Sequence, residues 1–117
     1  MNICIIIIKN NIDYDIIVKR LEKSRIDEIV AIMTETVCTK KKKFRVASDD
    51  FPAELVKSKL LKLDSEHIEF VIECLNENTS KVRNMKQYLL TALFNAPSTI
   101  SNYYSSLVNH DMKVYNN

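Results

Sequence analysis

The feature that most constrains this chain is that its 117 residues include no glycine, and prolines only at Pro52 and Pro97. Glycine provides the tight turns and the close backbone approach to phosphate on which dinucleotide-binding folds and P-loops depend. The sequence therefore excludes a GxGxxG fingerprint and a Walker loop. The remaining residues are rich in helix formers, so we expect a mostly α-helical fold.

Hydrophobic residues recur at spacings of three and four, which is typical of amphipathic helices. The segments with this pattern are residues 14–21, 26–37, 52–63, 64–75 and 84–94, and a last one from Pro97 to about Asn109. Asp64 or Ser65 is expected to cap one helix, and Pro97 to end one helix or begin the next. KFRVAS alternates as a strand does, so a short β-hairpin near residues 37–47 is the most β-structure expected. The predicted fold class is a compact bundle of about five to six helices.

The size and composition of the chain favour one domain with an ordinary core. We expect residues 13–112 to form it, residues 1–12 to be an extension or linker remnant, and residues 113–117 to be a tail. ICIIII is too short for a membrane span or a signal core. Cysteines at only three widely spaced positions argue against a disulfide framework and a structural zinc site. The chain is thus expected to be soluble and cytoplasmic, with no membrane contact.

The stretch DSEHIEFVIEC places His67 and Cys74 near each other on one flank of a helix. Such a pair could serve a metal or an activated thiolate, but no third ligand and no oxyanion hole accompany it. The interpretation we favour is that Cys74 packs as a small hydrophobe and His67 borders the core. No catalytic, cofactor-binding or metal-binding residues are predicted, and no enzyme.

Two charged segments are candidate binding surfaces. The first is an acidic ridge on the helix opposite its apolar stripe, made of Glu66, Glu69, Glu73 and Glu77. Like charges four residues apart destabilise a helix by roughly 0.2 to 0.5 kcal/mol per pair, so the ridge is either a solvated face or a docking surface for a basic partner. The second is a basic loop made of Lys40, Lys41, Lys42, Lys43 and Arg45. It could contact phosphates, pair with the ridge, or be a solvated turn.

Residues 26–112 carry a resemblance, above all in DDFPAELVKSKLLKLDSEHIEFVIECLNENTSKVRNMKQYLLTALFNAP and YYSSLVNHDM. These blocks resemble the C-terminal domain of RepA_N-type plasmid replication initiators of low-GC Gram-positive bacteria. In full-length members, an N-terminal winged-helix domain binds the origin repeats. The resemblance implies that this chain is a piece of such an initiator or a stand-alone relative. It also implies a monomeric domain, in an initiator that dimerises through the N-terminal domain.

That C-terminal domain resembles the helical domain of DnaD-type primosomal proteins. The resemblance implies a non-catalytic protein-interaction module for plasmid DNA replication, which recruits the host primase or another replisome protein to the origin. DnaD-type domains carry Tyr, Ile and Trp at spacings of four, whereas this chain has Tyr88, Ala92 and Ala96. This departure puts the associated single-stranded DNA binding in doubt. The alternative is a nucleic-acid-binding module, with a weak DNA contact through the basic loop at residues 40–45.

Overall fold

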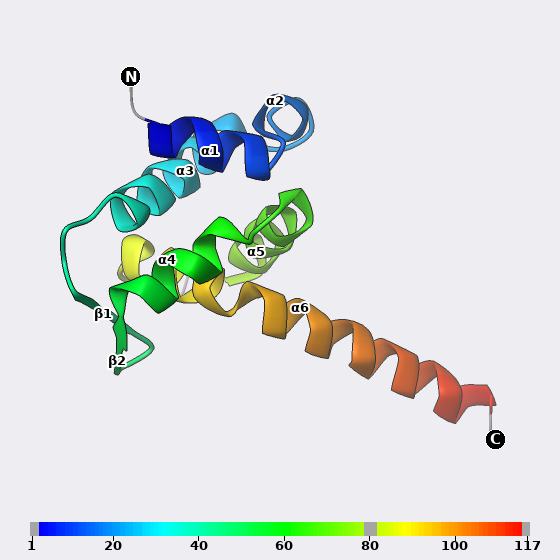
Figure 1. The fold of residues 1–117 in the computed structure, drawn as a ribbon. Helices are drawn as coiled ribbons and strands as arrows, with labels where there is room; N and C mark the ends of the chain where they lie inside the picture. The colour runs from blue at the N-terminus through cyan, green and yellow to red at the C-terminus, as the bar shows by residue number, and fades with distance from the viewer. Residues whose placement is uncertain (1–2, 79–81, 116–117) are drawn as a thin grey trace.

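The computed structural model describes residues 3–78 and 82–115, except for the side chains of residues 78 and 108–115. Within these ranges the elements are α1 (Ile3–Asn11), α2 (Tyr14–Ile17), α3 (Lys23–Val37), β1 (Lys43–Val46), β2 (Asp49–Pro52), α4 (Ala53–Leu61), α5 (Ser65–Asn78) and α6 (Met85–Tyr115). The prediction of a compact, mostly helical fold with one short hairpin is confirmed (Figure 1).

A single hydrophobic core joins these elements, with α3 in contact with α1, α4 and α6, and α5 packed along α6. The largest side chains that are fully enclosed are Ile8, Ile12, Ile17, Ile26, Ile29, Met33, Leu60, Leu63, Ile68, Leu75, Leu89 and Leu93. Burying each such side chain contributes roughly 1.5 to 3 kcal/mol. The apolar stripes identified between residues 14 and 94 thus supply the faces that meet in the core, whereas Tyr103, Tyr104 and Leu107 of the last segment are exposed.

Side-chain caps fix where α5 and α6 begin. The Asp64 carboxylate accepts a hydrogen bond from the backbone N–H of His67 at 3.2 Å, and the Asp64 N–H donates to His67 Nδ1 at 3.1 Å. The Asn84 side-chain oxygen accepts from the Gln87 N–H at 3.1 Å. Because each cap satisfies a backbone N–H that would lack an intrahelical partner, the helix starts are local features, and the cap predicted at Asp64 is confirmed.

The hairpin lies further along the chain than the sequence indicated. Strand β1 pairs antiparallel with β2, and Arg45 stands opposite Asp50. The turn uses Ala47 and Ser48 with φ of 51° and 71°, in the left-handed region that hairpin turns usually fill with glycine or asparagine. Since neither residue signals a turn, the sequence did not reveal that residues 49–52 form the second strand.

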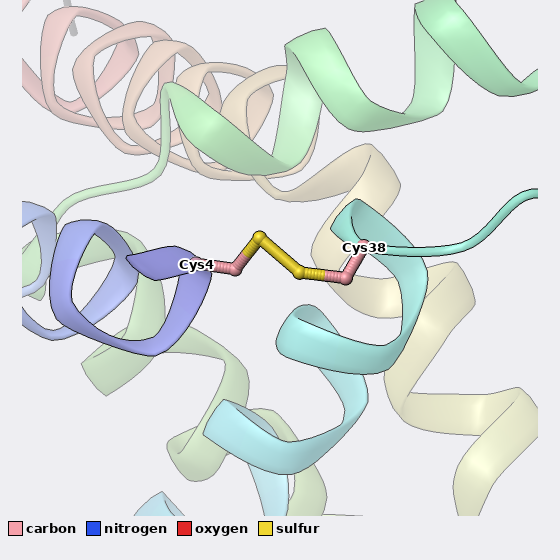
Figure 2. Close-up of a disulfide and its surroundings, with 2 residues drawn as sticks. All are labelled: Cys4 and Cys38. Atoms are coloured by element: carbon pink, nitrogen blue, oxygen red, sulfur yellow. A yellow bond between two sulfur atoms is a disulfide. The ribbon is translucent and has the colours of Figure 1, made fainter. Parts of the chain in front are cut away.

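The N-terminal isoleucine run forms α1, and this helix packs on α3. Ile8 and Ile12 are fully buried, whereas Ile3 is 70 % exposed. Cys4 on α1 forms a disulfide with Cys38 at the end of α3, with 6.5 Å between their Cα atoms (Figure 2). The inference against disulfides was therefore wrong for this pair, because helix packing brings together cysteines that are distant in the sequence.

The expectation that Pro97 separates two helices was also wrong. Pro97 lies inside α6, which continues to Tyr115 and carries its C-terminal half away from the body of the fold (Figure 1). An internal proline costs a helix one backbone hydrogen bond but does not force it to end. Within residues 3–78 and 82–115, no helix is long and apolar enough to cross a membrane.

Candidate functional site

Among the described residues, one glutamate of the acidic ridge forms an ion pair and the other three do not. Glu69 is turned toward the N-terminal part of the chain, where its carboxylate pairs with the Arg20 guanidinium at 3.5 Å. The other three glutamates of the ridge are exposed, and we call them the acidic rim: Glu66, Glu73 and Glu77. At 100° per residue, these three fall within a narrow arc beside Phe70.

An apolar groove of about 550 Å³ runs beside the acidic rim, between α5 and α6. Helix α5 contributes Phe70, Val71 and Cys74 to its lining. Helix α6 contributes a stripe at spacings of three and four, made of Gln87, Tyr88, Thr91, Ala92, Asn95 and Thr99. The sequence pattern showed that residues 84–94 are apolar around much of the helix, but it did not show that part of this surface faces solvent.

Tyrosines of α6 lie at one end of α5, beyond Thr99. The rings of Phe70 and Tyr103 have centroids 5.8 Å apart, and the Tyr104 hydroxyl donates to the Glu66 carboxylate at 3.3 Å. The negative charge of Glu66, this hydrogen bond and the charge of Glu73 raise the pKa of Tyr104. The acidic rim and the aromatic residues therefore belong to one continuous surface.

His67 and Cys74 have separate roles in this region. His67 completes the cap of α5 with Asp64, while Cys74 lines the groove. Burial, followed by the charges of Glu77 and Glu73, raises the pKa of the Cys74 thiol. A raised pKa disfavours the reactive thiolate. Among the described residues, no group of three or more histidine, cysteine or acidic side chains could hold a metal ion.

The basic loop is exposed and lies on the hairpin side of the fold. Lys43 and Arg45 stand in β1, and both pair with Asp50 across the hairpin, at 4.0 and 3.6 Å. The ammonium of Lys41 lies 5.9 Å from the centre of the Phe44 ring. A second, more polar pocket of about 340 Å³ lies between this loop and α6, and Lys86 and Glu35 line it as an ion pair at 2.7 Å.

The two charged surfaces do not neutralise each other. Within the ranges that the structure describes, no ion pair joins the basic loop to α5, and Asp50 is the acidic partner that the loop meets. The structure thus places the predicted residues on two separate surfaces. Glu66, Glu73 and Glu77 lie beside Phe70, which lines the groove, whereas Glu69 pairs with Arg20.

Comparison with known proteins identifies the family of this chain. The model of DUF6017, a family of unknown function, matches residues 1–115. No curated protein and no solved structure matches the chain.

Proposed function

This chain belongs to the DUF6017 family, and we propose that it is a non-catalytic protein-interaction module of a plasmid replication initiator. In this proposal it recruits the host replication machinery to the plasmid origin, and the primase is the partner that it binds. The domain corresponds to the C-terminal domain of RepA_N-type initiators and to the DnaD-like helical domain within them.

The observation that carries this proposal is the acidic face of α5. Three of its glutamates stand in solvent, and the basic loop of the same chain does not pair with them. Glu73 and Glu77 are four residues apart on the helix, so their repulsion costs roughly 0.2 to 0.5 kcal/mol. A basic partner would relieve that cost, and its opposite charge would speed the encounter. The resemblance of residues 26–112 to the initiator domain supports the choice of a replication protein as that partner.

The proposed setting is the bacterial cytoplasm, where glutathione and thioredoxin keep most thiols reduced. The Cys4–Cys38 bridge would therefore be open in the cell. The contact between α1 and α3 would then depend on packing, to which Ile8 and Ile12 contribute two fully buried side chains. The proposed module keeps its fold under these conditions because the core does not depend on the bridge alone.

Calorimetric titration of this chain with the host primase at two salt concentrations tests the proposal. Saturable binding that weakens at the higher salt concentration is expected, because screening reduces attraction between exposed charges. A duplex and a single-stranded oligonucleotide are the controls, and neither should approach the affinity of the primase.

Charge reversal then separates the two surfaces. Replacing Glu66, Glu73 and Glu77 with lysine should abolish primase binding, whereas replacing Lys40 to Lys43 with glutamate should leave it intact. Binding to DNA but not to the primase, lost on reversal of the basic loop, would contradict the proposal. It would make the basic loop the functional site.

A further inference from the structure

The groove between α5 and α6 has the dimensions and regularity of a site for one more helix. From Gln87 to Thr99, the α6 stripe measures roughly 18 Å at about 1.5 Å of rise per residue. Its residues recur every three or four positions, as the ridges of a packed helix do. The floor is mostly apolar because Phe70, Val71 and Ala92 contribute to it.

The charge beside the groove determines which kind of helix fits. The acidic rim is adjacent to the lining residue Phe70 around α5, and the charges of Glu77 and Glu73 add to burial in raising the pKa of the Cys74 thiol, which lines the groove. The polar side chains on the α6 side carry no formal charge and include Thr91, Asn95 and Thr99. An occupant therefore needs an apolar face with lysine or arginine along one border only.

We propose that this groove binds an amphipathic α-helix of a partner protein, with its apolar face against Phe70 and Ala92 and its basic border against Glu66, Glu73 and Glu77. Helix-in-groove recognition works in this way, with anchors every three or four residues. The inference rests on the proposed function and adds the docking site and the chemistry of the docked segment. Nucleic acid does not fit, because its phosphates would face the acidic rim.

A synthetic helical peptide tests the groove without knowledge of the partner. The probe has roughly 14 residues, with leucines on one face and lysines along one border, and carries a fluorophore for anisotropy. We expect saturable binding that weakens with salt. An analogue with glutamate in place of every lysine should bind about tenfold more weakly or worse. Equal binding of the two peptides would overturn the proposal.

Two pairs of matched variants locate the binding. Thr91→Arg obstructs the groove, and Ser58→Arg adds the same charge to an exposed site on α4 outside it. Only T91R should weaken the peptide, by about tenfold. The triple change Glu66→Gln, Glu73→Gln and Glu77→Gln should do the same. Its control removes equal charge elsewhere, through Asp15→Asn, Glu22→Gln and Glu54→Gln.

Circular dichroism and melting of each variant separate loss of the site from loss of the fold. Peptide binding that is unaffected by T91R and by the rim triple would overturn the groove as the site. Sedimentation of the chain alone completes the test. A dimer that disappears in T91R would assign the groove to a second copy of this chain and would also overturn the proposal.

The primase titration keeps this inference distinct from the proposed function. If the primase binds the chain and T91R equally well, the groove inference fails and the recruitment proposal stands. If the primase does not bind but the basic peptide binds in the groove, the choice of partner fails and the groove inference stands. If T91R binds neither the primase nor the peptide, both the recruitment proposal and the groove inference are supported.

Discussion

The acid-rimmed groove and the basic loop both concentrate charge, but they differ in what lies beside it. The glutamates of α5 border a mostly apolar groove, and two of them, Glu73 and Glu77, have no ion-pair partner among the described residues. The lysines and the arginine of the basic loop border a more polar pocket, and Asp50 balances part of their charge. A charge run alone therefore indicates little about binding. The surface next to it decides whether a partner could also bury apolar area.

The two regions also differ in how they are supported. The groove lies between two packed helices, and the core beneath them includes Leu93. The basic loop runs from beyond the end of α3 into strand β1 of the hairpin, and its lysines and arginine are exposed. We therefore expect substitutions in the core to disrupt the groove. The basic loop should be affected only by substitutions in or next to it.

The largest expected effect is on the support of the groove. Leu93→Ala should lower the free energy of unfolding by roughly 2 to 5 kcal/mol, because it removes a fully buried side chain and leaves a cavity. Lys41→Ala, in the basic loop, should change it by less than about 0.5 kcal/mol. Urea unfolding curves measure both changes. Comparable losses would show that the loop is part of the cooperative core and would remove the contrast.

Reduction of the disulfide should have the next largest effect. The bridge closes a long loop between Cys4 and Cys38, so opening it should cost about 3 kcal/mol. Melting curves with and without reductant measure the loss, and Cys74→Ala melted in the same way confirms which thiols respond.

The bridge ends at Cys38, directly after α3, whereas neither bridged cysteine is among the residues that line the groove. Hydrogen exchange at residues 34–38, where the Cys38 N–H donates to the Thr34 carbonyl at 2.9 Å, should therefore accelerate on reduction more than exchange at residues 88–95. Equal acceleration of both segments would contradict this separation.

A smaller, stabilising effect is expected at the hairpin turn. Ser48 has φ of 71°, a conformation that costs an L-residue roughly 1 to 2 kcal/mol and costs glycine little. Ser48→Gly should therefore raise the melting temperature slightly and leave peptide binding in the groove unchanged. Ser58→Gly, in α4, is the control and should lower the melting temperature instead.

The smallest effect concerns the ionisation of Tyr104. Its pKa lies above the ordinary value of 10.0 because of Glu66, so Glu66→Gln should bring the pKa down toward that value. Since the folded-state pKa is the higher one, this contribution to stability is present below pH 10.0 and is lost as the pH rises through the folded-state pKa. NMR titration of ring-labelled tyrosine measures the shift, and Glu69→Gln is the control that should leave it unchanged.

Most of the secondary structure was predictable because its signals are local. The apolar spacing predicted the helices around residues 26–37 and 64–75, and Asp64 predicted where the second of them begins. The failures came where a residue departs from its usual role. Ala47 and Ser48 form a turn without glycine, and Pro97 lies inside a helix.

The candidate site was only partly predictable. The sequence placed four glutamates on one side of a helix, but it could not assign Glu69 to Arg20 and the other three to the groove. The groove itself has no sequence signature, because half-buried Phe70 lies outside the apolar stripe of α5, and half-buried Tyr88 belongs to a segment that is apolar around much of its helix. The part of an apolar stripe that is covered depends on the neighbouring helix.

By itself, the sequence determined that this chain is mostly helical, where most helices begin, and which side chains carry its two concentrations of charge. These properties depend on residues within one or two turns of each other. Only the tertiary structure decided that α1 joins the core, that Cys4 meets Cys38, and that an apolar groove opens beside Glu66, Glu73 and Glu77. These features depend on contacts between distant segments, whose geometry is set by the packing of whole helices.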